Sequence, residues 1–411
     1  MTAQPVERPH DAPLDSPATD AGATRAGGSR VDAIDALRGL VIVLMVLDHV
    51  RDFFHAAAFS GDAMALDSGN PALFLTRWAT HLCAPTFVFL AGVSVWLQKA
   101  GGKSPADLSR FLVTRGLWLM ALELAVIGPG FNFGWWIFLQ VIWAIGFGMI
   151  VLAGLTRLPR GLVLALGVGI VLFHILLQQV PPATFGPFEA VWRALALRGP
   201  MVTPAGLLLV VYPAIPWLGL LLLGYGLGPV LVDRQGLRRG RVLALALSGL
   251  ALFAVVRGLN VFGADPTPWS VQSDPLWTGF SVISVSKYPP SPAYVLLMLG
   301  LALLLLLAFD RLRGTGVRVL LTFGRTPLFT YLLHIWIAHT LALLAGLATG
   351  VPASAFLNSI VDPDRLIAAG WGFGLPAVYG FWALTLVILY PLSRWFEGVK
   401  RRRRDWWLGY L

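Results

Sequence analysis

The sequence predicts an all-α protein, a polytopic bundle of about ten membrane-spanning helices with both termini in the cytoplasm. Hydrophobic residues make up 57% of the chain and charged residues only 13%, and the mean hydropathy is +0.73. These values lie outside the range of soluble globular domains. Apolar runs of roughly 20 residues, the length needed to cross a bilayer, recur along the chain. Between these runs, loops rich in Lys and Arg alternate with loops that are poor in them.

Three regions follow from this pattern. Residues 1–30 contain no apolar run and are rich in Pro, Ala, Asp, Thr and Gly, so we expect a disordered cytoplasmic tail without a cleaved signal peptide. Residues 31–392 form the predicted membrane domain, and residues 393–411 form a basic juxtamembrane tail. The predicted spans are 31–54, 73–98, 110–128, 134–155, 161–180, 205–231, 242–262, 291–309, 317–346 and 366–392.

The basic residues orient the bundle. The N-terminal tail, alternate loops and the C-terminal segment hold most of them, which identifies these parts as cytoplasmic. The opposite side keeps only Arg51, Arg77, Arg193, Arg198, Arg257, Lys287 and Arg365. One missed span would mix the two sets of loops, so the sorting supports the span count. On the outer side, only segments 181–204 and 263–290 are long enough to form caps.

The first span combines an apolar middle with charged residues at both ends. The eleven residues from Arg38 to His49 make nearly three helical turns, so both side chains lie on one face, about 16 Å apart along the axis. Asp52 falls close to the same line. Ionisable groups inside a membrane helix are costly and usually mark a functional site.

Other ionisable residues are expected at the depth of His49. They are Asp48, Arg51, Asp52, Arg77, His81, Glu123, Arg257 and His334. We expect them to surround a water-filled cavity that opens to the outer side. A structural interhelical hydrogen bond is the competing explanation for each single histidine, but three at one depth favour a site. His55, His174 and the single cysteine, Cys83, are expected to be structural.

A smaller polar group is expected near the cytoplasm. Asp35 and Arg38 begin the first span, and Arg325 lies in a GRTP segment where Gly324 and Pro327 predict a break in the helix. Free backbone groups beside a cation suit a phosphate. The alternative, which the sequence leaves open, is a local ion pair between Asp35 and Arg38.

Four segments carry a family resemblance: IDALRGLVIVLMVLDHVRDFF, HLCAPTFVFLAGVSVWL, LQVIWAIGFGMI and FGRTPLFTYLLHI. They resemble the bacterial branch of the membrane-embedded acetyltransferase family named for heparan-α-glucosaminide N-acetyltransferase, over most of residues 31–392. The Arg-Gly pair followed by His49 is also similar to a motif of membrane O-acyltransferases that modify bacterial polysaccharides. The resemblance implies transfer of an acetyl group from cytoplasmic acetyl-CoA to an amino or hydroxyl group of an extracytoplasmic glycan or related envelope acceptor.

One departure limits what the resemblance assigns. The position of the catalytic histidine in the lysosomal family member is Pro71 here, and His81 replaces an aspartate of the segment that follows. The choice of histidine therefore rests on the chemistry of the helices. Acetyl transfer needs a base near neutral pKa, a cation or donors for the oxyanion, and cations for the CoA phosphates.

We assign roles on these grounds. His49 is the predicted acid/base or acyl-accepting residue, because Asp48 and Asp52 can orient its ring, and His81 and His334 follow as further catalytic candidates. Arg38 and Arg325 are predicted to bind acetyl-CoA. The residues predicted to bind the acceptor or the oxyanion are Arg51, Arg77, Glu123 and Arg257.

Other functions find less support. The sequence has no HExxH, Cys/His cluster or P-loop, so we predict no metal, and its net charge of +10 is spread over loops rather than gathered on a nucleic-acid surface. A proton-coupled transporter of a small or sugar-like solute, with Asp48, Glu123 and His334 as a relay, is the alternative function. The terminal RRRRDWW segment is expected to bind anionic membrane lipid. We expect a bacterial inner-membrane location, and the oligomeric state stays open, a homodimer included.

Overall fold

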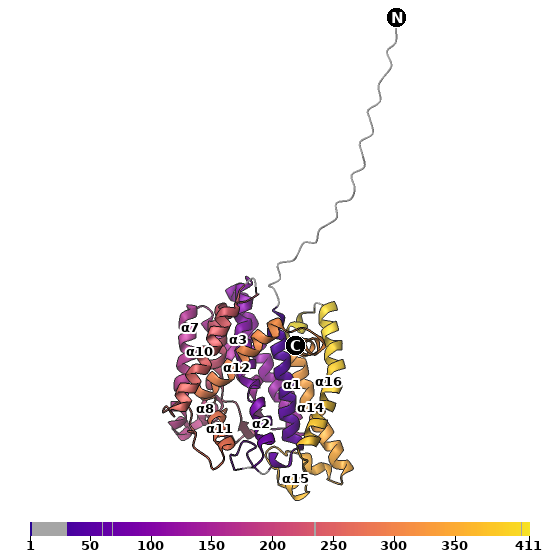
Figure 1. Cartoon of the computed structure of the whole chain (residues 1–411). Helices are drawn as coiled ribbons and strands as arrows, with labels where there is room; N and C mark the ends of the chain where they lie inside the picture. The colour runs from indigo at the N-terminus through magenta and orange to yellow at the C-terminus, as the bar shows by residue number, and fades with distance from the viewer. Residues whose placement is uncertain (2–30, 60, 68, 234–235, 404) are drawn as a thin grey trace.

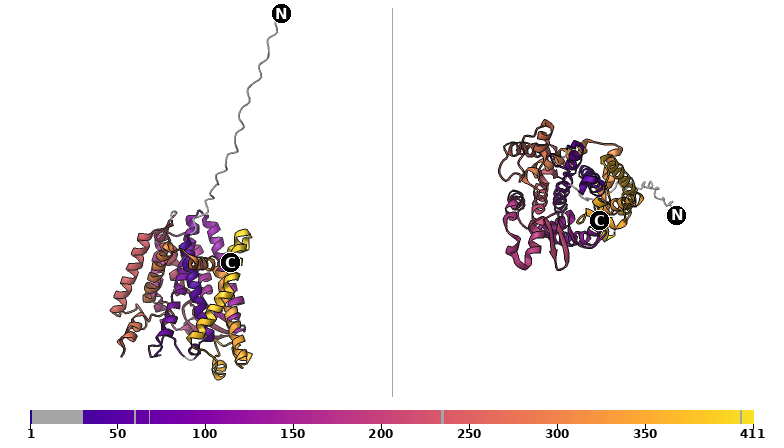
Figure 2. Two further views of the ribbon diagram at one scale, coloured as in Figure 1. Left: turned by 45° about the vertical axis from the view of Figure 1, so that its right-hand side comes forward. Right: turned by 90° about the horizontal axis from the view of Figure 1, so that it is seen from below.

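The computed structural model describes residue 1 and residues 31–59, 61–67, 69–233, 236–403 and 405–411. The described chain is a bundle of long, roughly parallel helices with α1 near its centre (Figures 1 and 2). The predicted all-α membrane bundle is confirmed, whereas the predicted disordered tail, apart from Met1, lies outside the described residues.

The helices account for most of the described chain. The α-helices are α1 (Asp32–Phe54), α2 (Pro71–Thr80), α3 (Cys83–Ala100), α4 (Pro105–Leu122), α5 (Gly128–Asn132), α6 (Val141–Leu155), α7 (Arg160–Phe173), α8 (Glu189–Ala196), α9 (Ala214–Leu231), α10 (Arg239–Gly258), α11 (Pro275–Ile283), α12 (Pro292–Arg311), α13 (Thr315–Arg325), α14 (Pro327–Ala348), α15 (Asp364–Ala368) and α16 (Leu375–Arg402). The 3-10 helices are η1 (Ala56–Ala58), η3 (His174–Gln179), η4 (Pro182–Phe188), η5 (Ala353–Phe356) and η6 (Trp406–Tyr410), and η2 (Glu123–Ile127) is a π-helix. The strands are β1 (Ile137–Leu139), β2 (Gly199–Thr203), β3 (Gly206–Val210), β4 (Val232–Asp233) and β5 (Gly236–Leu237).

In the described residues, eight helical segments are long and apolar enough to cross a membrane. They are Pro71–Ala100, Pro105–Asn132, Arg160–Gln179, Ala214–Leu231, Arg239–Gly258, Pro292–Arg311, Pro327–Ala348 and Leu375–Arg402. Two further helices match the remaining predicted spans: α1 has 23 residues but charged ends, and α6 is apolar but has only 15 residues. The total number of crossings therefore stays a prediction.

A small sheet replaces the beginning of two predicted spans. β2 and β3 form an antiparallel hairpin, and β3 also pairs in parallel with β1. Helix α9 therefore begins at Ala214 rather than at residue 205, and α6 begins at Val141 rather than at residue 134. Both predicted starts are wrong because a short apolar run such as LLLVV suits a strand as well as a helix, and its periodicity cannot separate the two.

The second predicted span consists of two helices that are separated at His81 and Leu82. Pro85 has no N–H group, so the carbonyl of His81 loses its ordinary helical partner four residues later. The hydroxyl of Tyr294 on α12 donates a hydrogen bond to this carbonyl at 2.8 Å instead. The break therefore ties the junction of α2 and α3 to α12.

Helix α1 contacts α3, α12, α13, α14 and α16. Two glycines bring the backbones of α1 and α13 into direct contact. A methyl group added to Gly39 would lie 1.9 Å from the carbonyl oxygen of Leu320, and one added to Gly324 would lie 1.7 Å from that of Asp35. The predicted break is confirmed, since α13 ends at Arg325 and α14 begins at Pro327.

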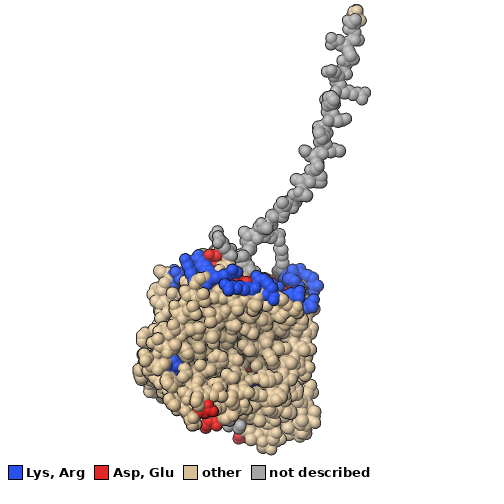
Figure 3. Space-filling model, viewed as in Figure 1, with Lys and Arg blue, Asp and Glu red and all other residues tan. Residues whose placement is uncertain are grey.

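Lys and Arg side chains form a band across one end of the molecule, above a surface that is mostly uncharged (Figure 3). Helix α1 begins at this end, and the C-terminus lies in the same half of the molecule (Figure 1). The band agrees with the sorting of basic loops in the sequence. Its assignment to the cytoplasmic side, with both termini there, stays a prediction.

Candidate active site

The end of α1 away from the basic band carries a buried ionic cluster centred on Asp48. Nη1 of Arg77, from α2, donates to both carboxylate oxygens of Asp48 at 2.5 and 2.6 Å. The hydroxyl of Thr80 donates at 2.9 Å, and Nη2 of Arg51 lies 3.3 Å from the same carboxylate. Nζ of Lys287, from the loop before α12, lies 3.9 Å away. Asp48 thus ties together α1, α2 and the loop before α12.

His49 lies beside this cluster and is oriented by Asp52. Its Nδ1 is 3.3 Å from Oδ2 of Asp52, whose other oxygen accepts a hydrogen bond from Arg51 at 2.6 Å. The spacing of three residues on one helix brings the imidazole and the carboxylate together. A carboxylate on Nδ1 leaves Nε2 of the neutral ring as a proton acceptor.

A cavity of about 330 Å³ opens beside His49. Its polar and ionisable lining residues are Asp48, His49, Asp52, Arg77, Cys83, Gln140, Arg198, Tyr212, Lys287, Tyr288, Tyr331 and Ser359. The side chain of His49 is 13% exposed, whereas His81 and His334 are buried and do not line this cavity. Of the three histidine candidates, His49 is therefore the one that a ligand in this cavity can touch.

The other two histidine candidates lie close to the cavity wall. The ring of His334, on α14, is 5.3 Å from that of His49, and its Nδ1 lies 2.5 Å from the carbonyl oxygen of Tyr331. Within the described chain, Nε2 of His334 and Nδ1 of His81 are buried without a hydrogen-bond partner. His334 thus packs directly against His49, and His81 occupies the junction of α2 and α3.

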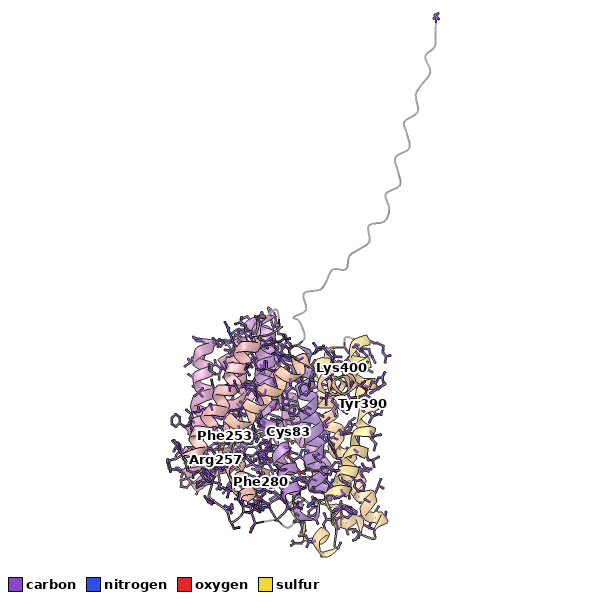
Figure 4. All side chains as sticks on the ribbon, in the orientation of Figure 1. Cys83, Phe253, Arg257, Phe280, Tyr390 and Lys400 are labelled. Carbon is purple, nitrogen blue, oxygen red and sulfur yellow. The ribbon has the colours of Figure 1, made fainter. Side chains whose placement is uncertain are left out.

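The remaining described histidines make structural contacts outside the cavity lining. Nδ1 of His55 accepts a hydrogen bond from the backbone N–H of Ala57 at 3.1 Å, and Nδ1 of His174 lies 3.0 Å from the carbonyl oxygen of Ile170. His339, which the sequence analysis did not single out, stacks between two phenylalanine rings at 4.5 and 3.7 Å. Cys83 lies inside the bundle at the start of α3 (Figure 4).

Glu123 and Arg257 lie outside the cavity lining. Glu123 is fully buried in the π-helix η2, where its Oε2 accepts the N–H of Trp143 at 3.0 Å and so caps the first turn of α6. Arg257 is buried near Phe280 in the half of the molecule opposite Lys400 (Figure 4). Both side chains are placed to position other elements rather than to touch a ligand in this cavity.

Arg257 organises the segment 263–290, the second predicted cap. Its guanidinium donates to the carbonyl oxygens of Thr267, Ser281, Val282 and Ser284 at 2.6 to 2.9 Å. Asp265, 3.7 Å from Arg257, accepts from the N–H of Ser286 and the hydroxyl of Ser291. These contacts fix the loop that carries Lys287 and Tyr288.

The two predicted external caps supply site residues that the sequence analysis did not assign. Arg198 comes from the first cap, and Lys287 and Tyr288 come from the segment at the end of the second. The guanidinium carbon of Arg198 is 4.5 Å from the centre of the Tyr288 ring, and Nζ of Lys287 is 5.1 Å from it. Burial favours a higher pKa of the Tyr288 phenol, but Lys287 and Arg77 hold this pKa below its ordinary value. The presence of outer cations in long loops was the only sequence signal for this group.

At the basic end, Arg38 and Arg325 meet around Asp35. Arg38 donates to Asp35 at 3.0 Å and to the hydroxyl of Ser94 at 2.5 Å. Arg325 pairs with Asp32 and Glu397 at 3.0 Å each and lies 3.9 Å from Asp35. The ion pair that the sequence left open as an alternative is therefore present, and the side chains of Arg38 and Arg325 stay 21% and 27% exposed.

Fold and site together define a multi-pass membrane protein with a polar site enclosed in its helix bundle. The family profile described as heparan-alpha-glucosaminide N-acetyltransferase, catalytic, matches residues 30–262, more than half of the chain. The chain belongs to this family, and the family implies acyltransferase activity. Comparison with curated proteins gives no match. The matched residues include Asp48, His49 and Arg77, but end before Lys287 and His334.

Proposed function

We propose that the protein transfers an acetyl group from cytoplasmic acetyl-CoA to an amino or hydroxyl group of an extracytoplasmic glycan or related envelope acceptor. The observation that carries this proposal is the position of His49, which lines the cavity with a carboxylate on its Nδ1. Family membership supports the reaction class. The basic residues at the other end of α1 support a cytoplasmic donor.

In the proposed reaction, Nε2 of His49 takes the proton from the attacking amine or hydroxyl group. The acceptor nitrogen or oxygen bonds to the thioester carbonyl carbon, the carbon–sulfur bond breaks, and the CoA thiolate receives the proton that His49 holds. Asp52 stabilises the imidazolium formed between these steps. His334, in ring contact with His49, limits the orientations open to the imidazole.

Arg77 is the proposed oxyanion-stabilising group. Its Nη1 binds both oxygens of Asp48, and its guanidinium lines the cavity. A cation fixed before the reaction stabilises developing negative charge without reorganising. Arg51 is buried and donates hydrogen bonds to both Asp48 and Asp52, which helps to hold the Asp48–Arg77 pair in place. Glu123 and Arg257 act as positioning residues in this scheme.

We propose that Arg38 and Arg325 attract the phosphates of the donor. Arg38 is the stronger candidate, because it shares a helix face with His49, whereas Arg325 lies on α13 with three carboxylates within 4 Å. An extended phosphopantetheine arm is about as long as the roughly 16 Å that separates Arg38 from His49 along α1. A donor held at Arg38 could thus present its thioester to the imidazole.

The test is acceptor-dependent release of free thiol from acetyl-CoA by the purified protein. Sustained release that stops when the acceptor is omitted supports transfer. Uptake of a sugar-like solute into proteoliposomes without thiol release would instead support the proton-coupled transporter. Fractionation of bacterial membranes tests the proposed inner-membrane location, and flotation with anionic vesicles tests lipid binding by the C-terminal segment.

A further inference from the structure

Two cations from separate external caps approach one tyrosine ring at the cavity. Arg198 lies between α8 and β2, whereas Lys287 precedes Tyr288 in the loop before α12. Arg198 and Lys287 lie 4.5 and 5.1 Å from the centre of the Tyr288 ring. The hydroxyl of Tyr288 donates to that of Tyr212 at 3.1 Å, which fixes the ring from its far end. All four side chains line the cavity beside His49.

The charges around this cavity do not balance. Asp48 and Asp52 are paired with Arg77 and Arg51 through hydrogen bonds of 2.5 to 3.3 Å. Lys287 lies 3.9 Å from its nearest carboxylate oxygen, which is beyond hydrogen-bond distance. Among the described residues, Lys287 has no hydrogen-bond acceptor and Arg198 has no carboxylate partner. The four cations Arg51, Arg77, Arg198 and Lys287 therefore face only two carboxylates, and Lys287 shares Asp48 with two arginines across 3.9 Å.

The surplus matters most at Lys287, because its side chain is only 4% exposed. A buried ammonium group is stabilised by a nearby anion and by acceptors for its three donors. Asp48 is a nearby anion, but two arginines and Thr80 already occupy its oxygens, so it stabilises the Lys287 ammonium only in part. A ligand oxyanion in the cavity would supply both the negative charge and the hydrogen-bond acceptors that Lys287 needs. Arg198, at the exposed rim, would attract this oxyanion toward the cavity.

We propose that Arg198 and Lys287 bind an oxyanion, a carboxylate or a phosphate, on the acceptor, so that the acceptor is an acidic or phosphorylated sugar. The cavity of about 330 Å³ lies at the lower end of the usual range for small-ligand pockets and suits one sugar residue. Tyr288, Phe87 and Phe138 add aromatic rings to the cavity lining against which a sugar ring can pack. That the bound sugar accepts the acetyl group rests on the proposed function, whereas the anion site is independent of it.

Binding is measured first without acetyl-CoA, on the whole protein in neutral detergent. Glucuronate and glucose 6-phosphate are the anionic probes, glucose is the neutral probe, and inorganic phosphate is the anion alone. We expect the two anionic sugars to bind more tightly than glucose or phosphate. Arg198→Gln and Lys287→Gln should each weaken their binding roughly 10- to 100-fold, the value of a hydrogen bond to a charged group. Arg193→Gln, on α8 of the same cap, is the matched control and should bind as the parent does.

Arg198→Gln is the decisive variant because its side chain is exposed and its replacement leaves the Asp48 cluster intact. Equal affinity for glucuronate and glucose, or unchanged affinity in both variants, would overturn the proposal. Loss of binding to vesicles containing phosphatidylglycerol, with sugar binding unchanged, would assign the cations to a lipid headgroup and would also overturn it.

Transfer assays then separate this inference from the proposed function. In Arg198→Gln, the KM for an acidic acceptor should rise while kcat is kept. Anion-dependent binding without any acetyl transfer would remove the proposed function and leave the site standing. Acetyl transfer to neutral sugars that neither variant affects would support the proposed function and remove the anion site.

Discussion

Nδ1 of His49 and Oδ2 of Asp52 lie 3.3 Å apart, with the two residues one turn apart on α1. This contact fixes one nitrogen of the imidazole and directs the other away from the carboxylate. It is the arrangement that a general base requires, with the ring held by a carboxylate and the side chain lining a cavity.

Replacement of His49 tests this assignment directly. His49→Gln should lower kcat by about 10²- to 10⁴-fold, the usual contribution of a general base, and should leave acetyl-CoA affinity unchanged. Steady-state transfer and equilibrium donor binding measure the two effects. His174→Gln, at a residue outside the cavity lining, is the control. Normal turnover in His49→Gln, together with an inactive His81→Gln or His334→Gln, would reassign the base.

Donor binding should depend on Arg38. Arg38→Gln is expected to weaken acetyl-CoA binding roughly 10- to 100-fold, because it removes charge-assisted hydrogen bonds to phosphate. Arg325→Gln should affect donor binding less, but should lower the melting temperature, since it leaves Asp32 and Glu397 without their cation. Arg157→Gln serves as a control from another basic loop. Unchanged donor affinity in both variants would move the phosphate site elsewhere.

The second cap should depend on Arg257. Arg257→Gln leaves buried carbonyl groups and Asp265 without their cation, and should destabilise the cap by about 3–5 kcal/mol. Limited proteolysis within residues 263–290 and thermal unfolding in detergent measure this change. Arg365→Gln is the control, because the Arg365 side chain is 60% exposed beside Asp362. Its proteolysis pattern and melting temperature should change little. Resistance to proteolysis in Arg257→Gln would show that the cap is held by other contacts.

Topology can be tested with reporter fusions. Fusions within residues 61–67 and at residue 411 should report opposite sides of the membrane if α1 crosses it once and the C-terminus is cytoplasmic. A fusion within residues 100–104, after α3, should report the same side as residue 411. Identical signals from the first two positions would remove an odd number of spans from the proposed topology.

Local sequence signals predicted the features that depend on one helix or one loop. The polar face of α1 follows from the spacing of Arg38 and His49, and the break between α13 and α14 follows from Gly324 and Pro327. These predictions needed only helical geometry and backbone chemistry.

Long-range packing determined what the sequence did not reveal. Arg198 and Lys287 converge on Tyr288 because two external caps fold against each other, and no spacing in the chain encodes that contact. The sequence also does not predict the pairing of β1 with β3, in which Ile137 lies opposite Leu208. This pairing is the reason why α6 and α9 begin later than predicted. Such features depend on tertiary contacts that override local preference.

The backbone contact between α1 and α13 has a mechanical consequence. At Gly39 and Gly324 the two backbones meet without an intervening side chain, so sliding one helix along the other would bring neighbouring side chains into overlap there. Arg38 and His49 lie on the same continuous helix, so we expect the axial distance between them to stay close to the rise of eleven helical residues. In the proposed reaction we therefore expect the extended arm of the donor, rather than a relative movement of helices, to span this distance. Acyl donors with a shortened arm should bind at the inner end and fail to react.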